Sequence, residues 1–178
     1  KGEADDDTII GGSGNDTIDG GADDDLLKGN GGDDSILSGG GNDTVQAGGG
    51  NDTVQVDLTL GLGDTNTVTG GRGQDTLKIV IMQADYDANQ VAILEEVSLA
   101  ARLIDLAKDN DSGAGVEKFV TTSIALLGIT LKGFETIELY TNNGGVLAPV
   151  VLTPYDIEID GTADADKLYG SVEIDTIN

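Results

Sequence analysis

Hydrophobic residues recur every nine positions through the first third of the chain. On a nine-residue frame that starts at Gly2, an aliphatic residue stands at position eight of six consecutive phrases. These residues are Ile9, Ile18, Leu27, Ile36, Val45 and Val54. One apolar residue between polar, β-prone neighbours predicts a strand of about three residues that turns one side chain inward.

Glycine fills most of positions one, two and four, and position five is Asn or Asp. Glycine allows the positive φ angles of tight turns, and Asn and Asp tolerate the left-handed conformation. Turns and short strands therefore alternate, which predicts a coil. Because such strands are too short to be stable alone, the phrases must stack, with two nine-residue phrases in each turn of the coil. Phrases n and n+2 then lie about 4.8 Å apart.

The repeat continues beyond the first block with an interruption. Residues 56–60 break the frame by five residues, and the register resumes in the phrases 61–69 and 70–78. Two further phrases, 161–169 and 170–178, follow a long segment without the repeat.

Position six is aspartate in nearly every phrase. Stacking predicts that Asp16 lies over Asp34, and Asp34 over Asp52. Carboxylates this close repel one another, and the chain has 9 Lys and Arg residues against 33 Asp and Glu. Ca²⁺ would offset the repulsion, because it accepts six to eight oxygen ligands in loose geometry. The candidate side-chain ligands are Asp7, Asp16, Asp25, Asp34, Asp43, Asp52, Asp75, Asp166 and Asp175.

The phrase GGSGNDTID at 11–19, and the phrase GGGNDTVQ that occurs twice later, resemble a known repeat. It is the G-G-x-G-x-D-x-U-x nonapeptide of RTX (repeats-in-toxin, haemolysin-type calcium-binding) proteins. The resemblance covers residues 2–55 well, 61–78 moderately and 161–178 partly. It implies a mainly β fold, a right-handed parallel β-roll or β-helix, with Ca²⁺ bound between successive turns by position-six aspartates and turn carbonyls.

The resemblance also implies a ligand set with at least four complete sites in these phrases. One site would combine Asp16 and Asp34 with carbonyl oxygens near Gly11, Ser13, Asn30 and Gly32. The carbonyl ligands implied for the whole block are those of Gly2, Ala4, Gly11, Ser13, Gly20, Gly21, Ala22, Asp23, Gly29, Asn30, Gly31, Gly32, Gly39, Gly41, Gly48 and Gly50.

Some phrases depart from the RTX pattern. Asp5 and Asp23 replace glycine at position four, and Asn30 replaces it at position two. Carbonyl ligands tolerate such changes, so we expect weaker turns without loss of sites. Asn66 replaces aspartate at position six, and its neutral amide oxygen predicts a weaker or vacant site.

The composition limits the possible functions. The 178 residues carry a formal net charge of −24 and include no Cys, His or Trp. The charge argues against nucleic acid and anionic membranes as partners and predicts an expanded chain without cations. Lack of His and Cys excludes a Ser-His-Asp triad, a Cys-His pair and the usual zinc sites, so we expect no enzyme in this segment. No apolar run reaches transmembrane length. The chain begins and ends within the repeat pattern, which favours a piece of a longer protein.

Residues 79–160 differ from the repeats, with little glycine and more aliphatic residues. Residues 77–82 read as a longer buried strand that ends the coil. An amphipathic pattern predicts a helix near 93–108, and residues 119–131 and 136–140 read as strands. A stack of strands needs its open end covered, so this segment is predicted to be an α+β cap, or an insert that bridges two repeat blocks. The predicted division is 1–78, 79–160 and 161–178.

The resemblance implies a calcium-binding structural module that folds when it binds metal. Without Ca²⁺ the carboxylates repel and the glycine-rich chain is costly to order, whereas bound Ca²⁺ converts binding energy into folding energy. It also implies export by type I secretion machinery and a place outside the bacterium or on its surface. Besides calcium, the expected partners are adjacent repeats or domains of the parent chain.

Two alternatives remain. The chain could be an adhesion or partner-binding segment of a surface protein, with 79–160 as its interaction face, or the RTX appendage of a secreted protease, lipase or alginate epimerase. The spacing Asp85-x-Asp87-x-Asn89 with Glu96 imitates an EF-hand loop, but Gln90 stands where that loop requires glycine.

Overall fold

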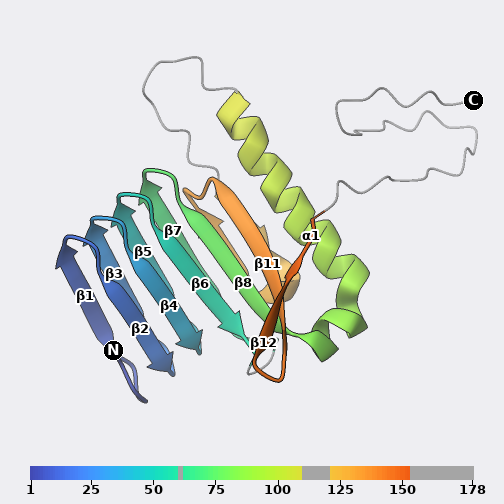
Figure 1. Ribbon diagram of the computed structural model, residues 1–178, viewed down its shortest axis with the longest axis horizontal. Coiled ribbons are helices and arrows are strands. Elements are labelled where there is room, and N and C mark those ends of the chain that lie inside the picture. Colours follow the sequence, from blue (N-terminus) through green and yellow to red (C-terminus); the bar gives the residue numbers. More distant parts are fainter. Residues whose placement is uncertain (60–61, 110–120, 153–178) are drawn as a thin grey trace, which may run out of the picture.

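The computed structural model describes residues 1–59, 62–109 and 121–152. Its strands form two six-stranded sheets (Figure 1). The first sheet has the order β1-β3-β5-β7-β10-β9, and the second has the order β12-β11-β8-β6-β4-β2. The repeat strands are β1 Thr8–Ser13, β2 Thr17–Ala22, β3 Leu26–Gly31, β4 Ser35–Gly40, β5 Thr44–Gly49, β6 Thr53–Leu58, β7 Asn66–Arg72 and β8 Thr76–Met82. The remaining elements are α1 Gln83–Asp109, β9 Thr121–Ile124, η1 Ala125–Leu127, β10 Ile129–Lys132, β11 Thr136–Asn143 and β12 Val146–Val150.

Consecutive repeat strands alternate between the two sheets. Thr8 of β1 pairs with Leu26 of β3, and Thr17 of β2 pairs with Ser35 of β4, both in parallel. The partners are 18 residues apart, as two stacked phrases require. Residues 56–58 of the insertion extend β6 and pair with residues 79–81 of β8, and β5 pairs with β7 in the same sense as before. The predicted parallel β-roll is confirmed.

The repeat strands are longer than the pattern predicts. Each of β1 to β6 has six residues. Strands β1 to β5 run from position seven of one phrase through position three of the next, and β6 runs from position seven into the insertion. In β2, both Ile18 and Gly20 are buried. The prediction of three-residue strands with one inward residue is wrong, because the parallel neighbours supply hydrogen-bond partners that keep the glycines in the sheet despite their low strand propensity.

Position eight forms the apolar column that the pattern predicts. Ile18 is 3% exposed, Leu27 and Val45 are fully buried, and Ile9 in the first strand is partly buried. Val68 of β7 and Leu77 of β8 extend the column after the insertion. Each phrase contributes one large apolar side chain, so the interior of the repeat region is narrow.

The coil continues for one turn beyond β8. β10 pairs in parallel with β7, and β11 pairs in parallel with β8. The prediction that 77–82 ends the coil is therefore wrong: two strands without the repeat sequence add a turn. The antiparallel strands β9 and β12 then flank this turn and end the two sheets.

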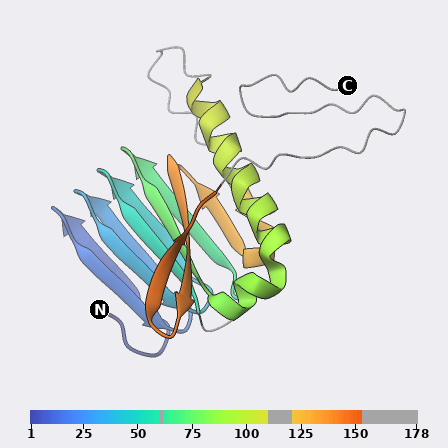
Figure 2. The same ribbon diagram turned by 45° about the vertical axis from the view of Figure 1, so that its right-hand side comes forward.

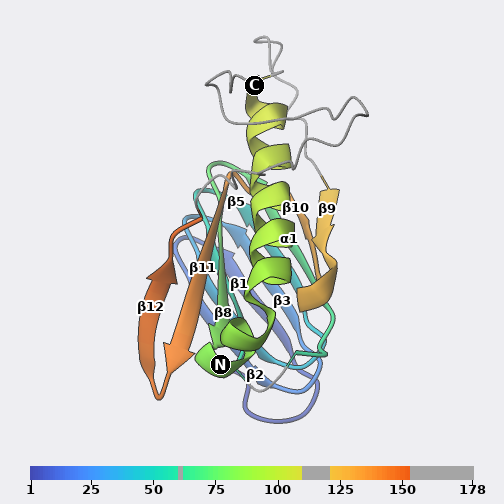
Figure 3. The same cartoon turned by 90° about the vertical axis from the view of Figure 1, so that its right-hand side faces the viewer.

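Helix α1 covers this end of the roll, where it crosses between the β11–β12 hairpin and the β9–β10 pair (Figures 2 and 3). It begins at Gln83, well before the predicted start at 93, and it is kinked at Asn89 (φ −127°, ψ 15°). Its buried residues include Ile93 and Val97. Because the EF-hand-like spacing from Asp85 to Asn89 lies within this helix, it forms no calcium loop.

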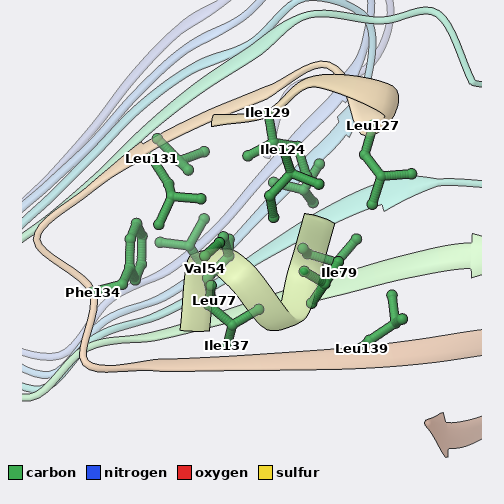
Figure 4. Packing of buried hydrophobic residues seen from close by; sticks show 14 of the residues in the cluster. Val54, Leu77, Ile79, Ile124, Leu127, Ile129, Leu131, Phe134, Ile137 and Leu139 are labelled. Carbon is green, nitrogen blue, oxygen red and sulfur yellow. The ribbon is translucent and has the colours of Figure 1, made fainter. Parts of the chain in front are cut away.

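The cap has a broader apolar core than the repeats. Leu131, Phe134 and Ile137 of the last turn lie beside Leu77 of β8, and Leu127 of η1 lies at the other end of the same cluster (Figure 4). This cluster joins the position-eight column into one continuous core. No helix in the described part of the chain is long and apolar enough to cross a membrane.

Candidate calcium centre: two ladders of aspartate loops

The loops between repeat strands stack along the two edges of the roll. The Asn66 edge carries the position-six residues Asp7, Asp25, Asp43 and Asn66. The Asp75 edge carries the position-six residues Asp16, Asp34, Asp52 and Asp75. The structure therefore brings together seven of the nine predicted aspartates, while Asp166 and Asp175 lie outside the described residues.

Each position-six side chain reaches back to the preceding turn. The Asp16 N–H donates to Asp34 Oδ1 over 2.8 Å, and the Asp34 N–H donates to Asp52 Oδ1 over 2.8 Å. The same bond joins Asp7 to Asp25 (2.8 Å) and Asp25 to Asp43 (3.0 Å) on the other edge. In each of these pairs, Oδ1 of the later aspartate thus accepts a hydrogen bond from a backbone N–H.

The second oxygen of these carboxylates is buried. Oδ2 has no hydrogen-bond partner in five aspartates of the described chain, namely Asp16, Asp25, Asp34, Asp43 and Asp52. Burial of a carboxylate oxygen without a donor is costly, and such groups in proteins are paired or coordinate metals. Five buried oxygens of the same kind, repeated along two edges, fit bound cations.

The backbone between two turns supplies further oxygens. The carbonyls of Asn30 and Gly32 point forward at Gly48 and Gly50, so closely that a Cβ on either glycine would overlap them. In the opposite direction, a Cβ on Gly29 would meet the Ala47 carbonyl, and the Gly32 N–H donates to the Gly49 carbonyl (2.8 Å). Glycine is required here because the carbonyls occupy the space of a side chain.

These directions change the ligand pairing that the resemblance implies. Carbonyls at positions two and four face the following turn, and those at positions one and three face the preceding turn. The Asn30 and Gly32 carbonyls therefore face the gap between Asp34 and Asp52, not the gap between Asp16 and Asp34. The Ala47 and Gly49 carbonyls, absent from the predicted set, face the same gap as Asn30 and Gly32.

The position-five side chains form a second ladder of hydrogen bonds, in which each side chain reaches forward to the following turn and not back to the preceding one. The Asp33 N–H donates to Asn15 Oδ1 (2.9 Å), and the Asn51 N–H donates to Asp33 Oδ1 (2.7 Å). Asn and Asp are used here as side-chain acceptors, so the predicted left-handed conformation is wrong at this position. In the described chain, the non-glycine residues with positive φ are Asp5 (85°), Asp23 (72°) and Asn30 (78°). They stand at positions four and two, so these turns keep their shape despite the replaced glycine.

Burial weakens the acidity of the inner carboxyls in the metal-free protein. It raises the pKa of Asp43 to about 6, opposed by the hydrogen bond from the Asp25 N–H and reinforced by the charge of Asp25. Burial also raises the pKa of Asp25 and of Asp52. A cation would reverse this effect, because a nearby positive charge favours the ionised form.

The Asp75 edge ends at a residue that the sequence interpretation missed. The Asp75 N–H donates to Glu135 Oε2, so Glu135 stands where the next position-six aspartate would be. The loop that leads to it is shorter: Gly133 stacks on Gly70, and only Phe134 separates Gly133 from Glu135. The signal was the order Glu135-Thr136-Ile137, which repeats Asp75-Thr76-Leu77 with a longer acidic side chain.

No three acidic side chains converge on one point in the described residues. A cation between two turns would therefore take its charge from two aspartates and its remaining oxygens from carbonyls. That donor set, all oxygen and mostly neutral, suits Ca²⁺, which accepts carbonyls and carboxylates in flexible geometry.

Comparison with known families agrees with this geometry. The model of the RTX calcium-binding nonapeptide repeat (4 copies) matches residues 1–27, 19–54 and 60–78. Residues 1–78 are therefore RTX calcium-binding repeats, and the β-roll described above is their fold. Neither curated proteins nor solved structures gave a match.

Proposed function

We propose that the chain is a calcium-dependent structural module of a larger exported bacterial protein, and that it folds when it binds Ca²⁺. The observation that carries the proposal is the series of five buried Oδ2 atoms without partners inside RTX loops. Each would be satisfied by an ion that bridges two turns.

The coupling of binding to folding follows from the arrangement of the aspartates. Asp34 contacts the Asp16 turn behind it and the Asp52 turn ahead of it, so it serves two gaps. Occupation of one gap fixes an aspartate that the next gap needs, which predicts cooperative binding. Without metal, the repulsion between stacked carboxylates and the ordering entropy of the glycines both oppose the roll.

The proposed location follows from the expected affinity. Extracellular calcium modules bind with dissociation constants of about 10⁻⁴ to 10⁻³ M, so sites of this kind are empty in the cytosol and filled outside the cell. Export of the unfolded chain by a type I system, followed by folding outside, fits both this affinity and the repeat family. The resemblance supports a secreted or surface location.

We assign no catalytic role to the chain. The close acidic pairs of the repeats are the stacked position-six aspartates of the two edges. In these pairs Oδ1 accepts a backbone N–H, and Oδ2 is buried in its loop. Calcium, neighbouring repeats and domains of the parent protein are its proposed partners.

A second candidate is a partner-binding segment, favoured by the apolar surface of the β11–β12 hairpin. Val146 is 69% exposed and Leu147 is 49% exposed at its tip. Replacement of both by Ser should abolish capture of a partner while calcium-induced folding persists. Capture that is unchanged by this replacement would reject the hairpin as the interaction face.

The main proposal is tested by far-UV circular dichroism during a calcium titration, with Mg²⁺ as the control ion. A steep gain of β signal that Mg²⁺ does not reproduce is expected. A spectrum that is fully folded in chelator and indifferent to Ca²⁺ would reject the coupling of folding to binding.

A further inference from the structure

The turn that ends the Asn66 edge is built differently from the other repeat turns. Position four has a positive φ angle in the preceding turns, as at Asp23 (72°) and Gly41 (121°). Asp64 holds position four here, and it is not among the residues with positive φ. Its backbone still packs tightly against the next turn, because a Cβ on Gly128 would overlap the Asp64 carbonyl oxygen.

A carboxylate oxygen lies in the gap between this turn and the preceding one. On the Asp75 edge the position-four N–H donates to a carbonyl of the following turn, as from Gly32 to Gly49 (2.8 Å) and from Gly50 to Arg72 (2.8 Å). On the Asn66 edge the Gly41 N–H donates to Asp64 Oδ2 (3.2 Å), as the Asp5 N–H does to Asp23 Oδ2 (3.2 Å). Asp64 thus places a carboxylate oxygen where the Asp75 edge has a neutral carbonyl oxygen.

The same turn loses a carboxylate at position six. Asn66 Oδ1 accepts the Asp43 N–H (3.0 Å), so the amide keeps the ladder but brings no charge. Relative to the repeat, the negative charge has moved from position six to position four. The gap between the two turns thus keeps two carboxylates, those of Asp43 and Asp64.

The burial of Asp43 is an independent observation that points to a cation in this gap. Asp43 is 1% exposed, and its Oδ2 has no hydrogen-bond partner. The Ser38 hydroxyl beside it donates to the Gly39 carbonyl (3.4 Å). Asn66 accepts only the backbone N–H of Asp43, so the buried Oδ2 of Asp43 is left for a cation.

We propose that Asp64 is a calcium ligand and replaces the missing position-six carboxylate in the gap between the Gly41–Asp43 turn and the Asp64–Asn66 turn. This inference rests on the proposed calcium-binding function. The last gap of the Asn66 edge is then a full site, in contrast to the weak or vacant site that Asn66 alone predicts.

The test counts bound ions in the full chain by isothermal titration calorimetry with CaCl₂, with circular dichroism at saturating Ca²⁺ to verify the fold. Asp64→Asn should remove one ion, or weaken one site at least tenfold. Asp57→Asn is the matched control, because Asp57 lies near the same insertion and its Oδ1 accepts the local Thr59 N–H (3.0 Å). An ion count and affinity unchanged by Asp64→Asn would overturn the inference.

Asn66→Asp gives a second test, which does not depend on the loss of a bound ion. If Asp64 already completes the site, this substitution leaves the ion count unchanged in the native background and restores the lost ion in the Asp64→Asn background. A gain of one ion in the native background would show that the gap was vacant and that Asp64 is not a ligand. A native chain that binds no Ca²⁺ would reject the proposed function itself, a separate result from either of these.

Discussion

The repeat turns and the end cap use the same parallel stacking but are stabilised by different means. A repeat turn has one large aliphatic residue per phrase, such as Val45, and buries carboxylates in its loops. The last turn, β10 and β11, has no such aspartate loop, and it is surrounded by α1, β9 and β12 with several large apolar residues. The same strand topology therefore buries stacked carboxylates in the loops along the roll and large apolar side chains at its end.

The strongest test of this contrast is removal of calcium. Excess EDTA should abolish hydrogen-exchange protection of the amides in β1 to β6, because the stacked carboxylates then repel without compensation. The amides of α1 near Ile93 should keep measurable protection, since their burial involves no aspartate loop. Equal loss of protection in both regions would show that the cap has no stability of its own.

A cavity in the core of the cap should destabilise the protein even when calcium is bound. Leu131 is fully buried, and Leu131→Ala should lower the free energy of unfolding by about 2–5 kcal/mol at saturating Ca²⁺. Urea denaturation measures the change. Leu147→Ala is the control, because Leu147 is 49% exposed and should cost no more than about 0.5 kcal/mol. Similar losses for the two variants would contradict the assigned packing.

Replacement of one position-six aspartate should have a smaller effect than the cavity in the cap, but a larger effect on calcium binding than replacement of the adjacent position-five residue. Asp34→Asn keeps an amide oxygen for the Asp16 N–H, as Asn66 does for Asp43, but it removes charge from two gaps. We expect calcium binding to weaken by roughly 1–3 kcal/mol, measured by calorimetry. Asp33→Asn should leave binding unchanged, because Asn already serves as the position-five acceptor at Asn51. Equal losses of calcium affinity in the two variants would contradict the assignment of calcium binding to position six and not to position five.

The smallest effect concerns pH in the absence of calcium. The pKa of Asp43 is raised to about 6 from 3.8, so the folded state holds this proton more tightly than the unfolded state does. The calcium-free fold should therefore gain stability as pH falls from above 6 toward 4, and lose it as pH rises through 6. Far-UV circular dichroism in EDTA at the two ends of this range measures the folded fraction of the repeats, which should be larger at the lower pH, and Asp43→Asn should reduce the difference. In Ca²⁺ the trend should reverse, because protons compete with the metal for the carboxylates.

The amino-acid sequence allowed much of the calcium centre to be predicted. Position six was found from its period alone, and the four stacked pairs that this period predicts occur in the structure: Asp7–Asp25, Asp16–Asp34, Asp25–Asp43 and Asp34–Asp52. The structure adds two pairs across the insertion, Asp43–Asn66 and Asp52–Asp75. The role of position five was misread, because Asn and Asp serve both as left-handed residues and as side-chain acceptors, and only the position of the next turn distinguishes these roles.

What the sequence by itself determined is the part of the protein that repeats: the register, the inner aliphatic column and the stacked aspartates. A strict period makes each local choice recur in every turn, so local chemistry is enough to predict it. Tertiary structure alone decided the rest. Glu135 lies at the end of one ladder because β11 docks on β8, and Asp64 contacts Gly41 because β7 stacks on β5. Both contacts join residues from different turns, and no period in the sequence encodes them.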